Sequence, residues 1–235
     1  MTLTLPSLLL TRIKDILMPM DSSWPVPFVL NPHNLAIDAG VSFCVSVLLA
    51  VMINAEAQAF VSTFLGDTRV DAKDRMHFNA FLHLDILGSI CYLVGGFGWP
   101  RTMDIDASKF KHPRLGMVIS RLAGPIANLL LAAIGGSVVT FMNMMNWEPR
   151  VFLMVIGVNI TTAVYHLLPI PPLAMGSLVT ELMPPDDVRT RSLFRLAGPY
   201  FIVALTLLDR ITHQGIISPY FDPLIKAVYA YFRTL

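Results

Sequence analysis

The stretch LAIDAGVSFCVSVLLAVMINAEAQAFVSTFLG, residues 35–66, decides the fold of this chain. Its segment 39–55 contains no aspartate, glutamate, lysine or arginine. A helix needs about 20 predominantly apolar residues to cross a hydrocarbon core of about 30 Å, and glycine is common just after a helix ends. We therefore predict a membrane-spanning helix over residues 35–65 that ends at Gly66.

The composition of the remaining chain repeats this pattern. Of the 235 residues, 54% are hydrophobic and 14% are charged, whereas about 25% are charged in soluble domains. Three further segments carry no charged residue, namely 86–100, 122–147 and 151–180. The net charge is +1 and the basic residues form no run, so nothing indicates binding to nucleic acid. The composition predicts an all-α integral membrane protein.

Proline, glycine and charged residues divide the chain into predicted helices and loops. Residues 1–34 are predicted to form an N-terminal interfacial segment, in which residues 7–18 form either a short amphipathic helix on the bilayer or a disordered tail. Residues 35–235 are predicted to form one transmembrane domain with five to six transmembrane helices. After the first helix we expect apolar helices over about 81–97, 115–145, 150–168 and 192–213, and a sixth, short or interfacial, over 218–235.

Four blocks of sequence occur in an order that is specific to a known family. They are Asn54-Ala-Glu-Ala-Gln-Ala-Phe-Val-Ser-Thr-Phe-Leu-Gly-Asp67, His83-Leu-Asp85-Ile-Leu-Gly88, Ala123-Gly-Pro-Ile-Ala-Asn128 and Leu167-Leu-Pro-Ile-Pro-Pro-Leu173. In this order they resemble the site-2 protease family of intramembrane zinc peptidases, in its short bacterial form. The resemblance implies a site-2-protease-like helical bundle in the bacterial cytoplasmic (inner) membrane.

The resemblance also places the family's metal motif in this chain. Members carry two histidines at i and i+4 that bind zinc, a glutamate that activates water, and an aspartate as third ligand. The matching positions here are Asn54, Ala55, Gln58 and Ala174. Alanine has no ligand atom, and amide oxygens are poor partners for zinc. We therefore predict degenerate motif positions, no metal, no cofactor, and a protein that is not an enzyme.

Other polar residues lie within the apolar segments. Glu56 points about 200° away from Asn54 around a helix, so it does not replace the missing base. It is predicted to be solvated at the membrane interface, to face a partner chain or to be protonated. Asn128 and Asn159 are predicted to join helices by hydrogen bonds, and His166 is a packing residue or a rescue metal ligand. The candidate binding residues are Glu56, Asn128, Asn159 and His166.

The remaining histidines and Arg121 are predicted to have structural or surface positions. His83 is assigned a structural role within its block. Arg121 is predicted to extend its side chain toward the membrane surface. The other histidines fall in or near loops and show no spacing typical of metal ligands: His33, His77, His112 and His213.

These features favour a protein that kept a membrane scaffold and lost its original chemistry. We predict a pseudoprotease that acts as a scaffold or accessory subunit and binds other integral membrane proteins in a hetero-complex. One alternative is an active intramembrane metallopeptidase that uses His166 and Glu56, or residues of a partner, at an unorthodox metal site. Another is a membrane subunit that binds haem or a pigment through His166 or His83.

Overall fold

The computed structural model describes residues 27–29, 36–69, 76–184, 187–212 and 215–233. Apart from residues 27–29, the predicted N-terminal interfacial segment over residues 1–34 lies outside the described residues. Within the described ranges the chain is helical, and the only strand-like pairing is an isolated antiparallel bridge between Leu84 and Pro100. The prediction of an all-α protein is confirmed.

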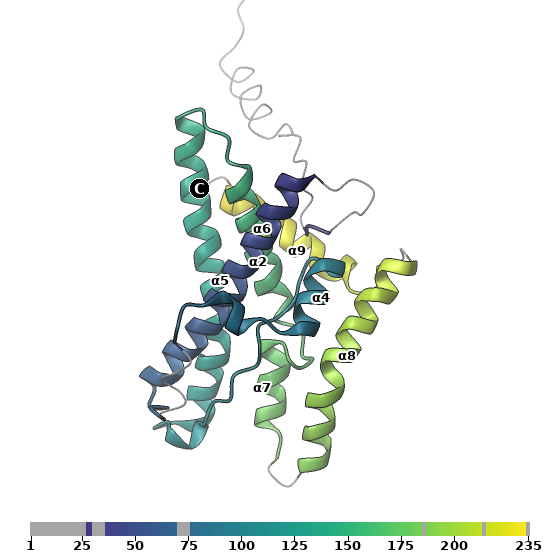
Figure 1. The fold of residues 1–235 in the computed structure, drawn as a ribbon. Coiled ribbons are helices and arrows are strands. Elements are labelled where there is room, and N and C mark those ends of the chain that lie inside the picture. The colour runs from purple at the N-terminus through teal and green to yellow at the C-terminus, as the bar shows by residue number, and fades with distance from the viewer. Residues whose placement is uncertain (1–26, 30–35, 70–75, 185–186, 213–214, 234–235) are drawn as a thin grey trace, which may run out of the picture.

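Three of the described helices pack together as a central bundle, and the others lie beside it. The α-helices are α2 (Ile37–Phe64), α4 (Ile86–Gly95), α5 (Pro113–Met144), α6 (Arg150–Tyr165), α7 (Ala174–Leu182), α8 (Val188–Thr212) and α9 (Ser218–Arg233), and the short 3-10 helices are η1 (Ala80–His83) and η2 (Ala107–Lys109). Helices α2, α5 and α6 pack against one another, and α4 packs against α8. Figure 1 shows the long helices α2 and α5 on one side of the molecule and α7 and α8 on the other.

Three of the described helices, α2, α5 and α8, are long and apolar enough to cross a membrane. The chain is therefore a membrane protein, but the predicted count of five to six spans is not confirmed. Helix α4 has 10 residues and α6 has 16, which correspond to about 15 and 24 Å against a core of about 30 Å. The predicted span over 81–97 is shorter in the structure because the side chain of Asp85 caps the start of α4 and Gly96, at φ 76°, ends it.

Helix α2 carries apolar residues around its whole circumference. Phe43 and Val51 are buried in the bundle, whereas Ile37 and Phe60 are mostly exposed on the outside. A helix that is apolar on every face is typical of a membrane span. The helix ends where the sequence predicts, since Gly66 adopts φ 124°, a conformation that favours glycine.

Close helix approach in the bundle depends on Gly135 and Gly136 of α5. A Cβ atom at Gly135 would lie 2.9 Å from the side chain of Ile156 in α6, and one at Gly136 would lie 2.2 Å from the backbone oxygen of Phe232 in α9. Small residues at such contacts let helix backbones pack closely in membranes. This pair therefore sets the distance of α5 from both neighbouring helices.

The block that contains His83 and Asp85 forms the structural corner before α4. The Asp85 Oδ1 atom accepts hydrogen bonds from the Gly88 N–H at 2.8 Å and from Trp99 Nε1 at 3.0 Å. Trp99 is 1% exposed. One carboxylate thus caps α4 and holds the following loop against it, and this loop forms a wall of the cleft described below.

Candidate functional site

Asn54 and Gln58 lie one helical turn apart on α2 and face α5. Gln58 Nε2 donates to Asn54 Oδ1 at 2.9 Å, and Asn54 Nδ2 donates to Asn128 Oδ1 at 2.6 Å. Helix α5 comes this close because Gly124 has no side chain, and a Cβ atom there would lie 2.5 Å from Asn54 Oδ1. The two positions that we predicted to match the family's histidines therefore hold amides that bond to each other.

Asn128 and Asn159 extend these contacts across three helices. Asn128 Nδ2 donates to the Ala50 oxygen at 3.0 Å and to Asn159 Oδ1 at 2.8 Å, and Asn159 Nδ2 donates to the Val155 oxygen at 2.8 Å. Both side chains are fully buried. They join α2, α5 and α6 by hydrogen bonds, and a role for either residue in binding a partner stays a prediction.

The series of hydrogen bonds that runs from Asn159 to Gln58 continues to Arg121 of α5. Its guanidinium forms a two-point ion pair with Glu181 of α7, in which Nη2 donates to Oε1 and Nε donates to Oε2. Its Nη1 donates to Gln58 Oε1 at 3.3 Å. The prediction that Arg121 extends to the membrane surface is wrong, because its side chain is 8% exposed and finds its counter-charge inside the protein.

The four motif positions do not fit a zinc ion. Ala55, Gln58 and Ala174 line a cavity of about 20 Å³, and Arg121 lines the same cavity. The two alanines offer only methyl groups, and the Arg121 guanidinium places a positive charge beside Gln58. A catalytic zinc site needs three ligands from imidazole, thiolate or carboxylate groups, and these positions supply none.

His166 borders the same small cavity and is 2% exposed. The backbone N–H of Ala174 donates to its Nδ1 at 3.4 Å. Among the described residues His166 belongs to no group of three potential metal ligands, so the structure does not bring it together with Glu56. A cavity of about 20 Å³ also leaves no room for a haem or a chlorophyll on this histidine.

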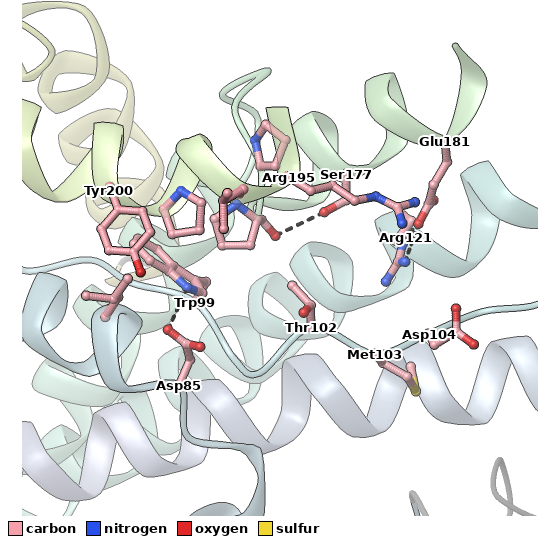
Figure 2. A pocket seen from close by; sticks show the side chains of 15 residues that line it. Asp85, Trp99, Thr102, Met103, Asp104, Arg121, Ser177, Glu181, Arg195 and Tyr200 are labelled. Atoms are coloured by element: carbon pink, nitrogen blue, oxygen red, sulfur yellow. Dashed lines mark hydrogen bonds and ion pairs between the residues drawn. The ribbon is translucent and has the colours of Figure 1, made fainter. Parts of the chain in front are cut away.

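A larger cleft of about 380 Å³ adjoins the motif positions. The cleft and the small cavity share five lining residues: Thr102, Met103, Arg121, Pro172 and Ser177. Figure 2 shows the Arg121–Glu181 ion pair at one end of the cleft and Asp85, Trp99 and Tyr200 at the other. The cleft therefore extends from the motif positions to the wall formed by α8.

Glu56 faces away from the motif positions and is buried, with 4% of the residue exposed. Its Oε1 accepts the backbone N–H groups of His77 at 3.1 Å and Phe78 at 2.8 Å, and lies 2.9 Å from His83 Nε2. Of the three alternatives predicted for Glu56, solvation at the membrane interface is wrong, because the segment 77–83 covers the side chain. The sequence did not indicate His77 and His83 as its neighbours, since they lie 21 and 27 residues away along the chain.

Comparison with known proteins identifies a relative. The chain is 32% identical over 230 residues to a protein of Bacillus subtilis (strain 168) named "Putative zinc metalloprotease YwhC", across 92% of this chain and 100% of the relative. No family model matches the chain, and no solved structure matches it.

The relative corrects one prediction and establishes the family. We predicted that the chain is not an enzyme, and this is contradicted because the relative's name describes a metalloprotease and so points to enzyme function. The contacts at Asn54, Ala55, Gln58 and Ala174 concern the zinc ligands at those four positions and do not decide whether the whole chain is an enzyme.

The alignment covers the whole relative, and the described helices include three of membrane-spanning length. The chain belongs to the site-2 protease family of membrane zinc metalloproteases.

Proposed function

We propose that the protein binds a segment of another integral membrane protein in its cleft. In this proposal it acts as a scaffold or accessory subunit of a membrane hetero-complex in the bacterial cytoplasmic membrane. The observation that carries the proposal is the position of the 380 Å³ cleft, between helix α8, which is long and apolar enough to cross a membrane, and the motif positions. A volume in this range is typical of pockets that bind ligands.

The lining of the cleft suits a short stretch of polypeptide. Leu87 and Leu196 offer apolar contacts, and the hydroxyl groups of Thr102 and Ser177 offer hydrogen-bonding groups. A chain segment that leaves its helical conformation inside a membrane must find partners for its backbone N–H and C=O groups. A mixed lining meets both needs, whereas a purely apolar cleft would favour a lipid chain.

Helix α8 is the route by which we expect a membrane segment to reach the cleft. Among its described residues only Gly198, Ile202 and Thr206 are buried. Leu196 and Tyr200 line the cleft and are 67% and 61% exposed, so they present apolar surface both to the cleft and to the surroundings. A partner helix that packs on this face places its end next to the polar lining.

Site-specific photo-crosslinking tests this proposal. A photoreactive phenylalanine analogue at Tyr200 is expected to capture a partner in native membranes, because this position lines the cleft. The same analogue at Leu208, also on α8 and 47% exposed but outside the cleft lining, is the matched control. We expect several-fold more capture at position 200, with the crosslinked peptide mapping to an apolar segment of the partner by mass spectrometry.

A competition variant makes this test specific to the cleft. Leu196→Trp adds bulk at the cleft wall and is expected to reduce capture at position 200 several-fold, whereas Leu207→Trp on the same helix leaves capture unchanged. Equal capture at positions 200 and 208 would contradict a segment bound in the cleft. Capture at position 200 that Leu196→Trp does not reduce would also contradict it. Purification from native membranes in mild detergent then shows whether the captured protein is present in constant proportion.

Peptide hydrolysis is a second candidate function, and the name of the Bacillus subtilis relative favours it. Because the four motif positions supply no metal ligand, hydrolysis here depends on groups elsewhere in the chain or on a partner. The test uses the captured segment, incubated with the purified protein in micelles. Two fragments whose formation stops on addition of a metal chelator support hydrolysis, and an intact segment after prolonged incubation argues against it.

A further inference from the structure

Glu56 is a buried carboxylate whose two oxygens have unequal surroundings. Oε1 receives two backbone N–H groups and lies 2.9 Å from His83 Nε2. Oε2 is buried and has no hydrogen-bond partner within the described part of the chain. A buried carboxylate oxygen without a partner is costly in an apolar helix such as α2, so a ligand at this point would be stabilising.

Two imidazole rings lie against this carboxylate. His77 Nδ1 is 3.8 Å from Glu56 Oε1, and the rings of His77 and His83 lie tilted by 35° with centroids 4.6 Å apart. One ligand atom from each of the three residues lies within 4.8 Å of the other two. Two histidines and one glutamate form a ligand set that zinc uses in proteins.

We propose that Glu56, His77 and His83 bind a divalent transition metal of the zinc class. Two ligands of a tetrahedral zinc lie about 3.4 Å apart when each bond is about 2.0–2.1 Å long. The observed separations of 2.9 and 3.8 Å from Glu56 Oε1 bracket this value. On binding, neutral His83 carries its ring proton on Nδ1 and coordinates through Nε2, so the contact between Nε2 and Glu56 Oε1 is replaced by a bond from each residue to the metal.

This site is separate from the motif positions and from the cleft. Glu56 is two residues from Asn54 and so points about 200° away around α2. None of the three residues lines the 380 Å³ cleft or the 20 Å³ cavity. The His77 side chain is 32% exposed, which leaves the fourth coordination position on the solvent side for a water molecule. The metal would hold the segment 77–83 against the C-terminal half of α2.

Zinc titration of the full-length protein tests the proposal. The protein is purified in detergent with a tag that contains no histidine, stripped with a chelator, and titrated with zinc alone in a calorimeter. We expect one zinc per chain, confirmed by elemental analysis, and a rise in the melting temperature on binding. Cobalt in place of zinc is expected to give the visible absorption bands of a tetrahedral site.

The variant His77→Ala is the decisive comparison, because His77 contacts Glu56 through its backbone N–H and this bond survives the substitution. Since changes to residues that only orient a ligand typically weaken metal binding 10–100-fold, loss of a ligand is expected to weaken it by more than about 100-fold. His112→Gln, at an exposed histidine outside the group, is the matched control and is expected to bind like the unaltered protein.

Three results would overturn the site. They are less than half an equivalent of bound zinc in the unaltered protein, equal affinity in His77→Ala, and equal loss in His112→Gln. His83→Gln is a second ligand variant that retains an amide beside Glu56. If it fails to fold, the comparison of His77→Ala with His112→Gln still decides the outcome, through both bound zinc and the zinc-dependent shift in melting temperature.

Discussion

Replacement of Arg121 by methionine is expected to lower the free energy of unfolding by about 3–5 kcal/mol. The substitution leaves the Glu181 carboxylate, whose side chain is 11% exposed, without its counter-charge. It also removes the donor to Gln58 Oε1. Breaking a buried ion pair on one side is this costly because the remaining charge is neither hydrated nor paired.

Denaturant titration in mixed detergent micelles, followed by circular dichroism, measures this effect. Arg150→Met is the matched control, because Arg150 pairs with Glu148 on the surface, where the two side chains are 51% and 62% exposed. Such exposed pairs contribute at most about 1 kcal/mol. The double variant Arg121→Met/Glu181→Leu removes both charges and is expected to recover most of the loss. An Arg121→Met protein as stable as Arg150→Met would show that the pair is hydrated.

Restoration of the family motif is expected to create a zinc site where this chain has none of the ligands. The variant combines Asn54→His, Ala55→Glu, Gln58→His and Ala174→Asp. The side chains at 54 and 58 already touch, with 2.9 Å between Gln58 Nε2 and Asn54 Oδ1, and positions 55, 58 and 174 line one cavity. The new ligands therefore converge on one point and supply the three-ligand set of a catalytic zinc site.

The measurement is zinc content and affinity in a His77→Ala background, so that zinc held near Glu56 does not contribute. We expect one added zinc per chain relative to the His77→Ala parent. The matched control keeps Ala174 and carries only the other three substitutions, and it is expected to bind zinc more than about 100-fold more weakly because it lacks one ligand. A folded four-substitution variant with no more zinc than its parent would show that the positions do not converge.

Several elements of the fold follow from local sequence. The apolar run of α2 predicts a membrane span because its length and composition match the hydrocarbon core. The left-handed conformation at Gly66 ends that helix, as a glycine after an apolar run predicts. Local sequence did not predict the ends of α4. The apolar composition of 81–97 predicted one longer helix, whereas the cap at Asp85 and the left-handed Gly96 set its bounds. Apolar composition alone does not separate a spanning helix from a short buried one.

The contacts of the charged residues could not be read from local sequence. Arg121 pairs with Glu181 across 60 residues, and Glu56 meets His83 across 27. Periodicity shows which face of a helix a residue occupies and leaves open what covers that face. Arg121 was therefore assigned to the membrane surface, and three alternatives stayed open for Glu56, whereas packing of α7 and of the segment 77–83 buries both residues beside partners within the chain.

The sequence by itself determined the membrane class, the family blocks and the side chains at positions 54, 55, 58 and 174. These properties depend on composition and on the atoms that each residue carries, which folding does not change. Only the tertiary structure decided the position of the cleft, the Arg121–Glu181 ion pair, and the meeting of Glu56 with two histidines. The physical reason is that these arrangements arise where helices distant in the chain pack together, and the free energy of that packing is spread over many contacts rather than encoded in any one motif.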